Sequence, residues 1–402
     1  MRHSHVSIIG AGLGGLCLAQ GLKQAGIAFD VYERDPAAAS RSQGYRIRVD
    51  AEGQDALSRC LPANLYELFQ QSCRASRSVQ FLDCDLEHTE GRPARSWRTS
   101  TVGSDAQPKA PDLSANRQTL REILLCGVED RVHFGNTFRC FEVVGEDEVR
   151  VQFDDGEALT STLLVGADGV NSVVRGQLVP AAEPVDTGAV CIYGKSAATT
   201  ALREFVGTTL LTGTSVIFAD GFTVILDPML FPEPLPIIAA RLAPVCRLNP
   251  VDDYVYWAFI GPRASFGISV TELPDQIRLS TLIESIVHRW HARLRMLFAH
   301  WDANTLAMVP VRSSSPEIAK WRPGPVTLLG DAIHAMSPAG GVGANTALRD
   351  AAALAAAASI GPDLRQAVTR YEIAMRKWAA TAIRASDDGA RSLFHATTTH
   401  DT

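Results

Sequence analysis

The chain opens with a short apolar run and a helical pattern that are joined by a glycine-rich turn. Residues 6–9 are largely apolar and β-branched, which predicts a strand. Leu18, Leu22 and Ala25 then recur at helical spacing, and a second apolar run covers residues 28–32. The pattern therefore predicts a strand, a helix and a second strand within about thirty residues, which is the order of a βαβ unit.

The middle of the chain has the pattern of a sheet followed by helices. We expect strands at residues 149–153, 163–165, 190–193, 208–211, 215–218, 222–226, 254–260 and 266–270. We expect helices over residues 276–298 and 345–358, and a last one that starts near Pro362. The apolar, proline-rich stretch 227–240 is either a mobile lid for a hydrophobic substrate or a packed surface crossover.

Composition narrows the class of protein. The 402 residues are 46% hydrophobic and 20% charged, with a net charge of -6, so the length suggests two or three globular domains. This charge argues against a surface for nucleic acid or acidic lipid. No signal-peptide pattern follows Met1, and no uncharged apolar run approaches the roughly 20 residues of a membrane-spanning helix. We expect a cytoplasmic protein without a membrane span.

The eight cysteines do not form a recognisable framework. They are dispersed, with no CxxC pair and no histidine at the spacing of a metal ligand. We expect free thiols in a reducing compartment, and neither disulfides nor a metal site.

The first glycine-rich turn has the chemistry of a dinucleotide site. Gly10, Gly12 and Gly15 satisfy GxGxxG between the predicted strand and helix, and Glu33 ends the second strand. The glycines allow a tight turn, close approach of a pyrophosphate and close packing of the helix on the sheet. The helix start favours phosphate, and Glu33 can accept hydrogen bonds from ribose hydroxyls. These features predict NAD or FAD, and they do not choose between the two.

Two later motifs each follow a predicted strand. Gly166-Ala167-Asp168-Gly169 comes after residues 163–165 and is followed by Arg175, while Gly330-Asp331 comes after residues 326–329 and leads into the turn 337–345. Together with the first motif, they resemble the FAD-dependent aromatic hydroxylases, the class A flavoprotein monooxygenases with the p-hydroxybenzoate hydroxylase fold.

The resemblance implies an α/β fold. We expect a Rossmann-like, GR2-type FAD-binding domain with an inserted mixed or antiparallel β-sheet substrate domain and C-terminal helices. The FAD-binding domain would be discontinuous, over residues 1–75, 101–180 and 276–355. The substrate domain would comprise residues 76–100 and 181–275, and a C-terminal helix and tail would comprise residues 356–402.

The resemblance also implies which residues contact the cofactor. Arg117 would reach the FAD phosphates, Asp331 would bind the ribityl chain, and the turn that ends at Asn345 would cover the isoalloxazine ring. Arg46 would contact the cofactor or the substrate. The full set of implied cofactor contacts is Gly10, Gly12, Leu13, Gly14, Gly15, Glu33, Arg34, Arg46, Arg117, Asp168, Asp331, Pro338, Gly341, Gly343, Ala344 and Asn345.

The activity implied by the resemblance is that of a single-component FAD-dependent monooxygenase. A transient NADH or NADPH would reduce FAD, and a flavin C4a-hydroperoxide formed with O₂ would pass one oxygen atom to an aromatic or polycyclic substrate. Hydroxylation, epoxidation and Baeyer-Villiger insertion all stay open, as do a monomer and a homodimer. The alternatives are a halogenase or reductase of the same fold and a nonenzymatic FAD-binding protein that shelters an intermediate.

Few features of the sequence bear on the substrate. Tyr45 and Tyr193 are candidates for substrate-facing groups, whereas the middle of the chain has few evident cationic anchors. This favours a bulky, hydrophobic natural product over a small carboxylate. None of the five lysines suggests a catalytic position, because Lys23 lies in the first predicted helix and Lys109 in a proline-flanked loop.

Overall fold

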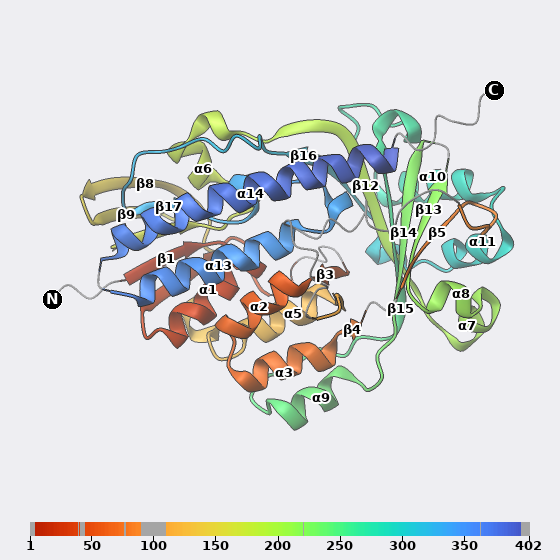
Figure 1. Ribbon diagram of the computed structural model, residues 1–402, viewed down its shortest axis with the longest axis horizontal. Helices are drawn as coiled ribbons and strands as arrows, with labels where there is room; N and C mark the ends of the chain where they lie inside the picture. The colour runs from red at the N-terminus through yellow and green to blue at the C-terminus, as the bar shows by residue number, and fades with distance from the viewer. Residues whose placement is uncertain are drawn as a thin grey trace.

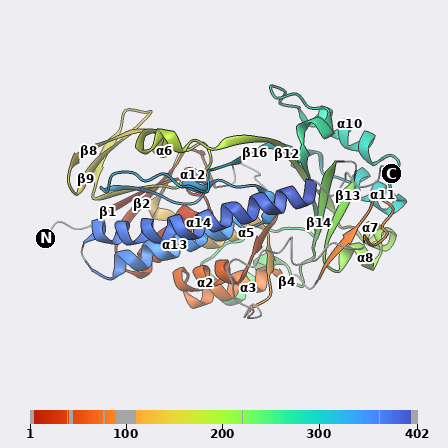
Figure 2. The ribbon, with the colours of Figure 1, turned by 45° about the horizontal axis from the view of Figure 1, so that its top comes forward.

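The computed structural model describes residues 5–38, 40, 45–75, 78–89, 110–219, 221–361 and 363–394. Two regions are visible in Figure 1: a parallel sheet with helices at one end of the molecule, and a larger sheet with its own helices at the other. The long helix α14 (Leu364–Phe394) reaches from the first region to the second, and Figure 2 shows the same arrangement after rotation. The hydroxyl group of Thr223, in the larger sheet, donates a hydrogen bond to the carbonyl oxygen of Leu393 near the end of α14.

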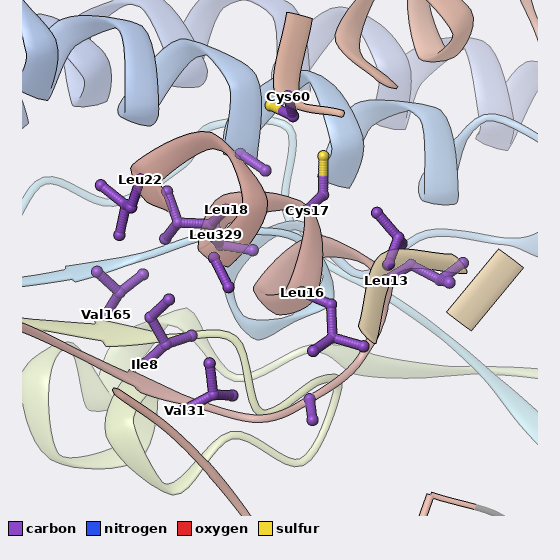
Figure 3. Packing of buried hydrophobic residues seen from close by; sticks show 14 of the residues in the cluster. Ile8, Leu13, Leu16, Cys17, Leu18, Leu22, Val31, Cys60, Val165 and Leu329 are labelled. Carbon is purple, nitrogen blue, oxygen red and sulfur yellow. The ribbon is translucent and has the colours of Figure 1, made fainter. Parts of the chain in front are cut away.

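The parallel sheet contains the predicted strand–helix–strand unit. Its five strands among the described residues, in spatial order, are β17 (Val326–Leu328), β11 (Leu163–Gly166), β1 (His5–Ile9), β2 (Ala28–Glu33) and β7 (Val132–Phe134). Helix α1 (Leu13–Gln24) connects β1 to β2, and Figure 3 shows Leu18 and Leu22 of this helix above Ile8 and Val165 of the sheet. Burial of this apolar face explains why the helical pattern was readable in the sequence.

Helices and a small sheet complete this region. The further helices are α2 (Ala51–Cys60), α3 (Ala63–Ser72), α5 (Arg117–Leu125), α6 (Val173–Leu178), α12 (Asp331–His334) and α13 (Gly343–Ser359). Helix α13 packs against α1, α2 and α14, and Figure 1 shows α13 and α14 side by side. The antiparallel strands β8 (Phe138–Gly145), β9 (Glu148–Phe153) and β10 (Ala158–Ser161) add side chains to the same core.

A second small sheet lies beside α2. It pairs β6 (Leu113–Ala115) with β3 (Ile47–Val49) on one side and β4 (Arg74–Ala75) on the other, all antiparallel. Because β3 and β6 come from distant parts of the chain, their pairing brings the predicted Arg46 next to the start of α5.

The larger sheet has six strands among the described residues. In spatial order they are β16 (Ala307–Ser313), β12 (Val185–Ala197), β15 (Tyr254–Pro262), β14 (Phe222–Met229), β13 (Thr214–Ala219) and β5 (Val79–Leu82). All neighbours are antiparallel except β13 and β5, which confirms the mixed sheet. The helices α7 (Thr200–Val206), α8 (Thr208–Leu211), α10 (Gln276–Val287) and α11 (Ala292–Ala299) bury one of its faces.

The opposite face of this sheet carries a separate group of side chains, which we call the inner face. It contains Ala189, Cys191, Tyr193, Ile225, Ala258, Ile260 and Val311, with Tyr45 and Tyr256 packed against them. Tyr45 comes from the chain just before β3, so the inner face lies toward the region that holds the glycine-rich turn.

Three predictions of local structure, at residues 208–211, 266–270 and 276–298, differ from the structure. The predicted strand 208–211 is the short helix α8, because Leu210 packs into the core under the larger sheet. The predicted strand 266–270 is a 3₁₀ turn, Arg263–Phe266, followed by irregular chain. The predicted helix 276–298 is broken into α10 and α11. In the stretch 227–240, β14 continues to Met229 and α9 (Leu235–Leu242) packs on α3.

The break between α10 and α11 has a local cause. The Nδ1 atom of His291 accepts a hydrogen bond from the backbone N–H of Arg293 and starts a new helix, while Trp290 turns inward onto Phe298. Both helices pack on the six-stranded sheet. Residues 276–299 therefore lie with the sheet that the sequence-based division assigned to the substrate domain, and not with the parallel sheet.

No helix in the described ranges is long and apolar enough to cross a membrane. None of the eight cysteines, all of which the structure describes, takes part in a disulfide.

Candidate active site

The glycines of the first turn have different surroundings. Gly10 has φ +108°, and a Cβ atom there would lie 2.4 Å from the carbonyl oxygen of Ala167. A Cβ atom on Gly15 would lie 2.1 Å from the carbonyl oxygen of Gly10, so both positions require glycine. Around Gly12, which caps α1, there is open space within 4 Å of the Cβ position. The backbone N–H groups of Leu13 and Gly14 have no intrahelical partner at the helix start, so they can face a phosphate group.

Glu33 fixes this turn from the end of β2. One carboxylate oxygen accepts a hydrogen bond from the backbone N–H of Ala11 at 2.8 Å, and the other accepts one from Asp35 at 3.0 Å. The guanidinium group of Arg121 donates to the carbonyl oxygen of Ala11. Arg34, the next predicted contact, is exposed at the surface.

Arg117 stands at the first position of α5. The side chain of Asn116 accepts a hydrogen bond from the backbone N–H of Thr119 and so caps the helix. Burial and the nearby Arg121 lower the pKa of Arg117, whereas Asp331 and Tyr193 raise it. Arg117 therefore lies near both Asp331 and Tyr193 of the inner face. It remains a cation at any ordinary pH.

The Gly330-Asp331 turn is held by a buried carboxylate. Asp350 accepts a hydrogen bond from the backbone N–H of Gly330 at 2.9 Å, lies 2.5 Å from Nε2 of His334, and accepts another bond from the indole of Trp378 in α14. Burial lowers the pKa of His334, but Asp350 and Asp331 raise it by more. His334 is thus a fully buried partner of Asp350 and does not itself face the open site.

Asp331 has a different position from Asp350. Its side chain is exposed to solvent, yet the surrounding protein reduces its hydration and raises its pKa, while His334 and Arg117 lower it. The exposed carboxylate of Asp331 can therefore accept hydrogen bonds from hydroxyl groups of a ligand.

The turn that leads into α13 is tied to β3. Asn345 donates hydrogen bonds to the carbonyl oxygens of Arg48 and Gly341 at 3.0 and 3.1 Å, and its own oxygen accepts one from Asp50. Gly341 has φ +61°, which favours glycine. Pro338 starts the preceding 3₁₀ turn, Gly343 and Ala344 begin α13, and a Cβ atom on Gly343 would lie 3.8 Å from Oδ1 of Asp331.

The carboxylate of Asp168 is hydrogen-bonded to residues that follow it closely in the chain. Its carboxylate accepts hydrogen bonds from Ser172 at 2.6 Å and from the backbone N–H groups of Val173 and Val174, so it caps α6. Burial raises the pKa of Asp168, and these hydrogen bonds oppose that rise. The Asp168 backbone also packs against Gly10, which connects the second motif to the first.

Arg46 forms a buried ion pair with the larger sheet. Its Nε atom lies 2.5 Å from Oδ2 of Asp227 in β14, and the two side chains are only 10% and 4% exposed. Ser114 of β6 donates a hydrogen bond to Asp227 and accepts from Arg46. Arg46 therefore joins β3, β6 and β14 at the boundary between the two regions.

Two models of known protein families match the sequence of this chain. The model described as "NAD(P)-binding Rossmann-like domain" matches residues 8–66, and the one described as "FAD binding domain" matches residues 274–371. These ranges contain the first glycine turn and the Gly330-to-Asn345 segment. Together with the relatives and the solved structure described next, these matches show that the chain belongs to the FAD-dependent monooxygenases of the aromatic hydroxylase type.

Relatives of this monooxygenase family support the assignment along nearly the whole chain. A dual O-methyltransferase/FAD-dependent monooxygenase from Cercospora beticola is 36% identical over 97% of this chain, which spans 46% of that protein. The Aurachin C monooxygenase/isomerase from Stigmatella aurantiaca is 27% identical, with 91% and 84% of the two chains covered. The chain thus spans about half the length of the first of these relatives.

A solved structure agrees with the fold. The putative FAD-containing monooxygenase from Photorhabdus luminescens superposes with a TM-score of 0.78 at 28% identity, covering 98% of this chain and 99% of the other. The FAD-dependent monooxygenase fold is therefore shared over both sheets.

The structure brings most predicted site residues of this family together. The glycine turn, Arg117, Asp331 and the Gly341–Asn345 turn lie close together beyond the carboxyl ends of β1 and β17, where ligands bind in open α/β sheets. Arg34 stands apart at the surface.

Sequence reasoning missed several residues of the inner face, notably Lys195 and Asp227. The available signal was period-2 alternation, since Cys191, Tyr193 and Lys195 share one side of a single strand. The predicted strand ended at residue 193, so Lys195 fell outside it.

Proposed function

We propose that this chain is a single-component FAD-dependent monooxygenase of the cytoplasm, acting as a monomer or homodimer. It would use NADH or NADPH to insert one oxygen atom of O₂ into an aromatic or polycyclic substrate; oxygen transfer from a flavin C4a-hydroperoxide is part of this proposal. The observation that carries it is that the glycine turn, Asp331 and the Gly341–Asn345 turn lie close together, with Arg117 near both Asp331 and Tyr193 of the inner face.

These neighbouring residues have the features that FAD requires. The open space at Gly12 and the start of α1 would receive the diphosphate with help from Arg117, and Glu33 would face the adenosine ribose. Asp331 would hold the ribityl chain. The turn from Pro338 to Asn345 would lie along the isoalloxazine ring, whose redox chemistry would activate O₂.

The inner face would receive the substrate. Cys191, Ile225, Ala258 and Ile260 make it apolar, so it would bury a hydrophobic ring and exclude water from the reaction. Two relatives favour a bulky natural product: one is named for aurachin C, and the other joins a monooxygenase to an O-methyltransferase, an activity that consumes hydroxyl groups.

Oxygen incorporation tests this proposal. Purified protein loaded with FAD should oxidise NADH or NADPH faster when a panel of polycyclic phenols is added, and ¹⁸O₂ should label the product. The Asp331→Ala variant should lose FAD and this activity together, whereas protein without added phenol gives the uncoupled background.

Other outcomes identify the alternatives. A product that forms only with halide would indicate a halogenase. Product formation without oxygen labelling would indicate a reductase. If FAD binds but neither NADH nor NADPH reduces it in the presence of any phenol, a nonenzymatic FAD-binding protein is favoured.

A further inference from the structure

The inner face carries a row of three polar side chains across three adjacent strands. Lys195 of β12 is in register with Tyr256 of β15, which is in register with Asp227 of β14. Because side chains alternate along a strand, Lys195 lies on the same side as Tyr193 and Cys191, both of which belong to the inner face. The row therefore borders the apolar patch that would hold the substrate.

Lys195 is a half-buried cation whose charge has no counterion among the described residues. Its Nζ atom lies 5.4 Å from the ring centroids of both Tyr45 and Tyr254, and no ion pair or side-chain hydrogen bond joins it to the described part of the chain. Aromatic ring faces attract a cation but leave its hydrogen-bond donors unused. An anionic oxygen atom would satisfy these donors.

The carboxylate in the same row does not serve this purpose. Asp227 lies two strands away and already pairs with Arg46, with Ser114 as an additional donor. Arg46 and Asp227 thus neutralise each other, whereas Lys195 leaves a net positive charge at its end of the row.

Tyr256 stands between them with a second unused donor. No hydrogen bond connects its hydroxyl group to another residue in the described ranges, and its side chain is half-buried. Burial raises the pKa of Tyr256 well above its ordinary value, with Cys191, Tyr193 and Asp227 adding to the rise and Arg46 opposing it. The hydroxyl group is therefore protonated and able to donate.

The two rings that face the ammonium group of Lys195 belong to Tyr45 and Tyr254, and the backbone N–H of Asp302 donates to the carbonyl oxygen of Lys195. Burial raises the pKa of Tyr254 above its usual range, and its hydroxyl group donates to the carbonyl oxygen of Tyr45 and accepts from Asn116. Arg117 lies beyond Tyr193 and adds positive charge to this side of the site. The local field therefore favours a negative charge on a ligand.

We propose that Lys195 is a specificity-determining residue that binds an ionised oxygen atom, a phenolate or an enolate, of a polycyclic aromatic substrate, with Tyr256 as a second donor. This inference rests on the proposed function, because it takes the inner face as the substrate wall. Binding the ionised form also makes the ring more electron-rich, which suits transfer of an electrophilic oxygen atom.

Ligand ionisation gives a direct test on the FAD-loaded protein without reductant. The probe is 4-nitro-1-naphthol, whose neutral and ionised forms absorb differently; 1-nitronaphthalene is its uncharged counterpart and 1-naphthoate supplies a carboxylate. At a pH where the free naphthol is ionised, wild-type protein should bind it about tenfold or more tighter than 1-nitronaphthalene. A spectroscopic titration should show the pKa of the bound naphthol at least about one unit lower than in Lys195→Met.

Variants separate this role from a structural one. Lys195→Met and Lys195→Gln should both lose the preference, and Lys195→Arg should keep most of it. Lys377→Met, which removes an exposed lysine on α14, is the matched control and should behave like wild type. Lys195→Met and Lys195→Gln both remove the charge of Lys195, so the test still gives a result if one of them fails to fold.

Three outcomes would overturn the proposal. They are equal binding of the naphthol and 1-nitronaphthalene by wild type, an unchanged bound pKa in the Lys195 variants, and a stronger preference for 1-naphthoate than for the ionised naphthol. None of these measurements needs turnover. Failure of the ¹⁸O₂ experiment would therefore contradict the monooxygenase activity and leave the Lys195 result standing.

Discussion

Glycines at neighbouring positions of the first turn perform different tasks. Gly15 allows α1 to approach the carbonyl oxygen of Gly10, which is a requirement of folding. Gly12 has an ordinary negative φ of -76° and open space around its Cβ position, so the fold alone does not require glycine there. The space at Gly12 is where we propose that the FAD diphosphate binds.

This contrast predicts different effects of the same substitution. Gly12→Ala should leave the melting temperature of FAD-free protein nearly unchanged and weaken FAD binding by about tenfold or more, because the methyl group would occupy the phosphate space. Gly15→Ala should lower the free energy of unfolding of FAD-free protein by about 1–3 kcal/mol through overpacking.

Thermal unfolding and FAD titration of both variants make the comparison. Equal loss of stability in both, or full FAD affinity in Gly12→Ala, would contradict this division of roles.

Predicted ligand residues can have local partners as well. Glu33 and Asp168 both accept backbone hydrogen bonds, and Asp168 caps a helix. A motif in the sequence identifies such carboxylates, but only the folded structure shows which of their oxygen atoms already accept hydrogen bonds.

At the scale of elements, the Arg46–Asp227 pair joins the small sheet to the larger one. The pair is buried, so removing one partner leaves an uncompensated charge or polar group. Asp227→Asn should therefore destabilise the protein by about 3–5 kcal/mol.

A double-mutant cycle in urea checks this expectation. The double variant Arg46→Met/Asp227→Leu should lose less free energy of unfolding than the sum of the losses in Arg46→Met and Asp227→Leu, because the two side chains interact. If the free energy of unfolding of Asp227→Asn falls by less than about 0.5 kcal/mol, the pair does not hold the two sheets together.

Errors in predicting elements also have physical causes. Residues 208–211 have the composition of a strand, yet they form α8 because Leu210 is needed in the core beneath the sheet. The helical pattern over 276–298 is real on both sides of the break, and only the capping contact of His291 reveals the turn. Local propensity is weaker than such tertiary contacts.

For the whole molecule, the proposed FAD site is assembled from distant segments. Residues near positions 12, 117, 331 and 343 come together only when the chain is folded. FAD should therefore bind the folded state selectively, and at a concentration of 100 times the dissociation constant it should add about 2.7 kcal/mol of stability.

Removal of FAD should lower the melting temperature, and its return should restore it. FMN is the matched control, because it lacks the adenosine half that the glycine turn and Glu33 would hold, and it should stabilise the protein much less. If FMN raised the melting temperature as much as FAD does, the proposal that the glycine turn binds the adenosine half of FAD would be contradicted.

The sequence by itself determined the βαβ unit, the three glycine-containing motifs and hence the FAD-dependent monooxygenase family, because these depend on residues close together in the chain. The tertiary structure alone decided that residues 276–299 pack on the larger sheet, that Arg46 pairs with Asp227, and that Lys195 stands beside Tyr256. These facts depend on strand register and on contacts between distant segments: Lys195 and Tyr256 are 61 positions apart (256 − 195), and Arg46 and Asp227 are 181 apart (227 − 46). A local pattern carries no information about which distant side chain will be its neighbour.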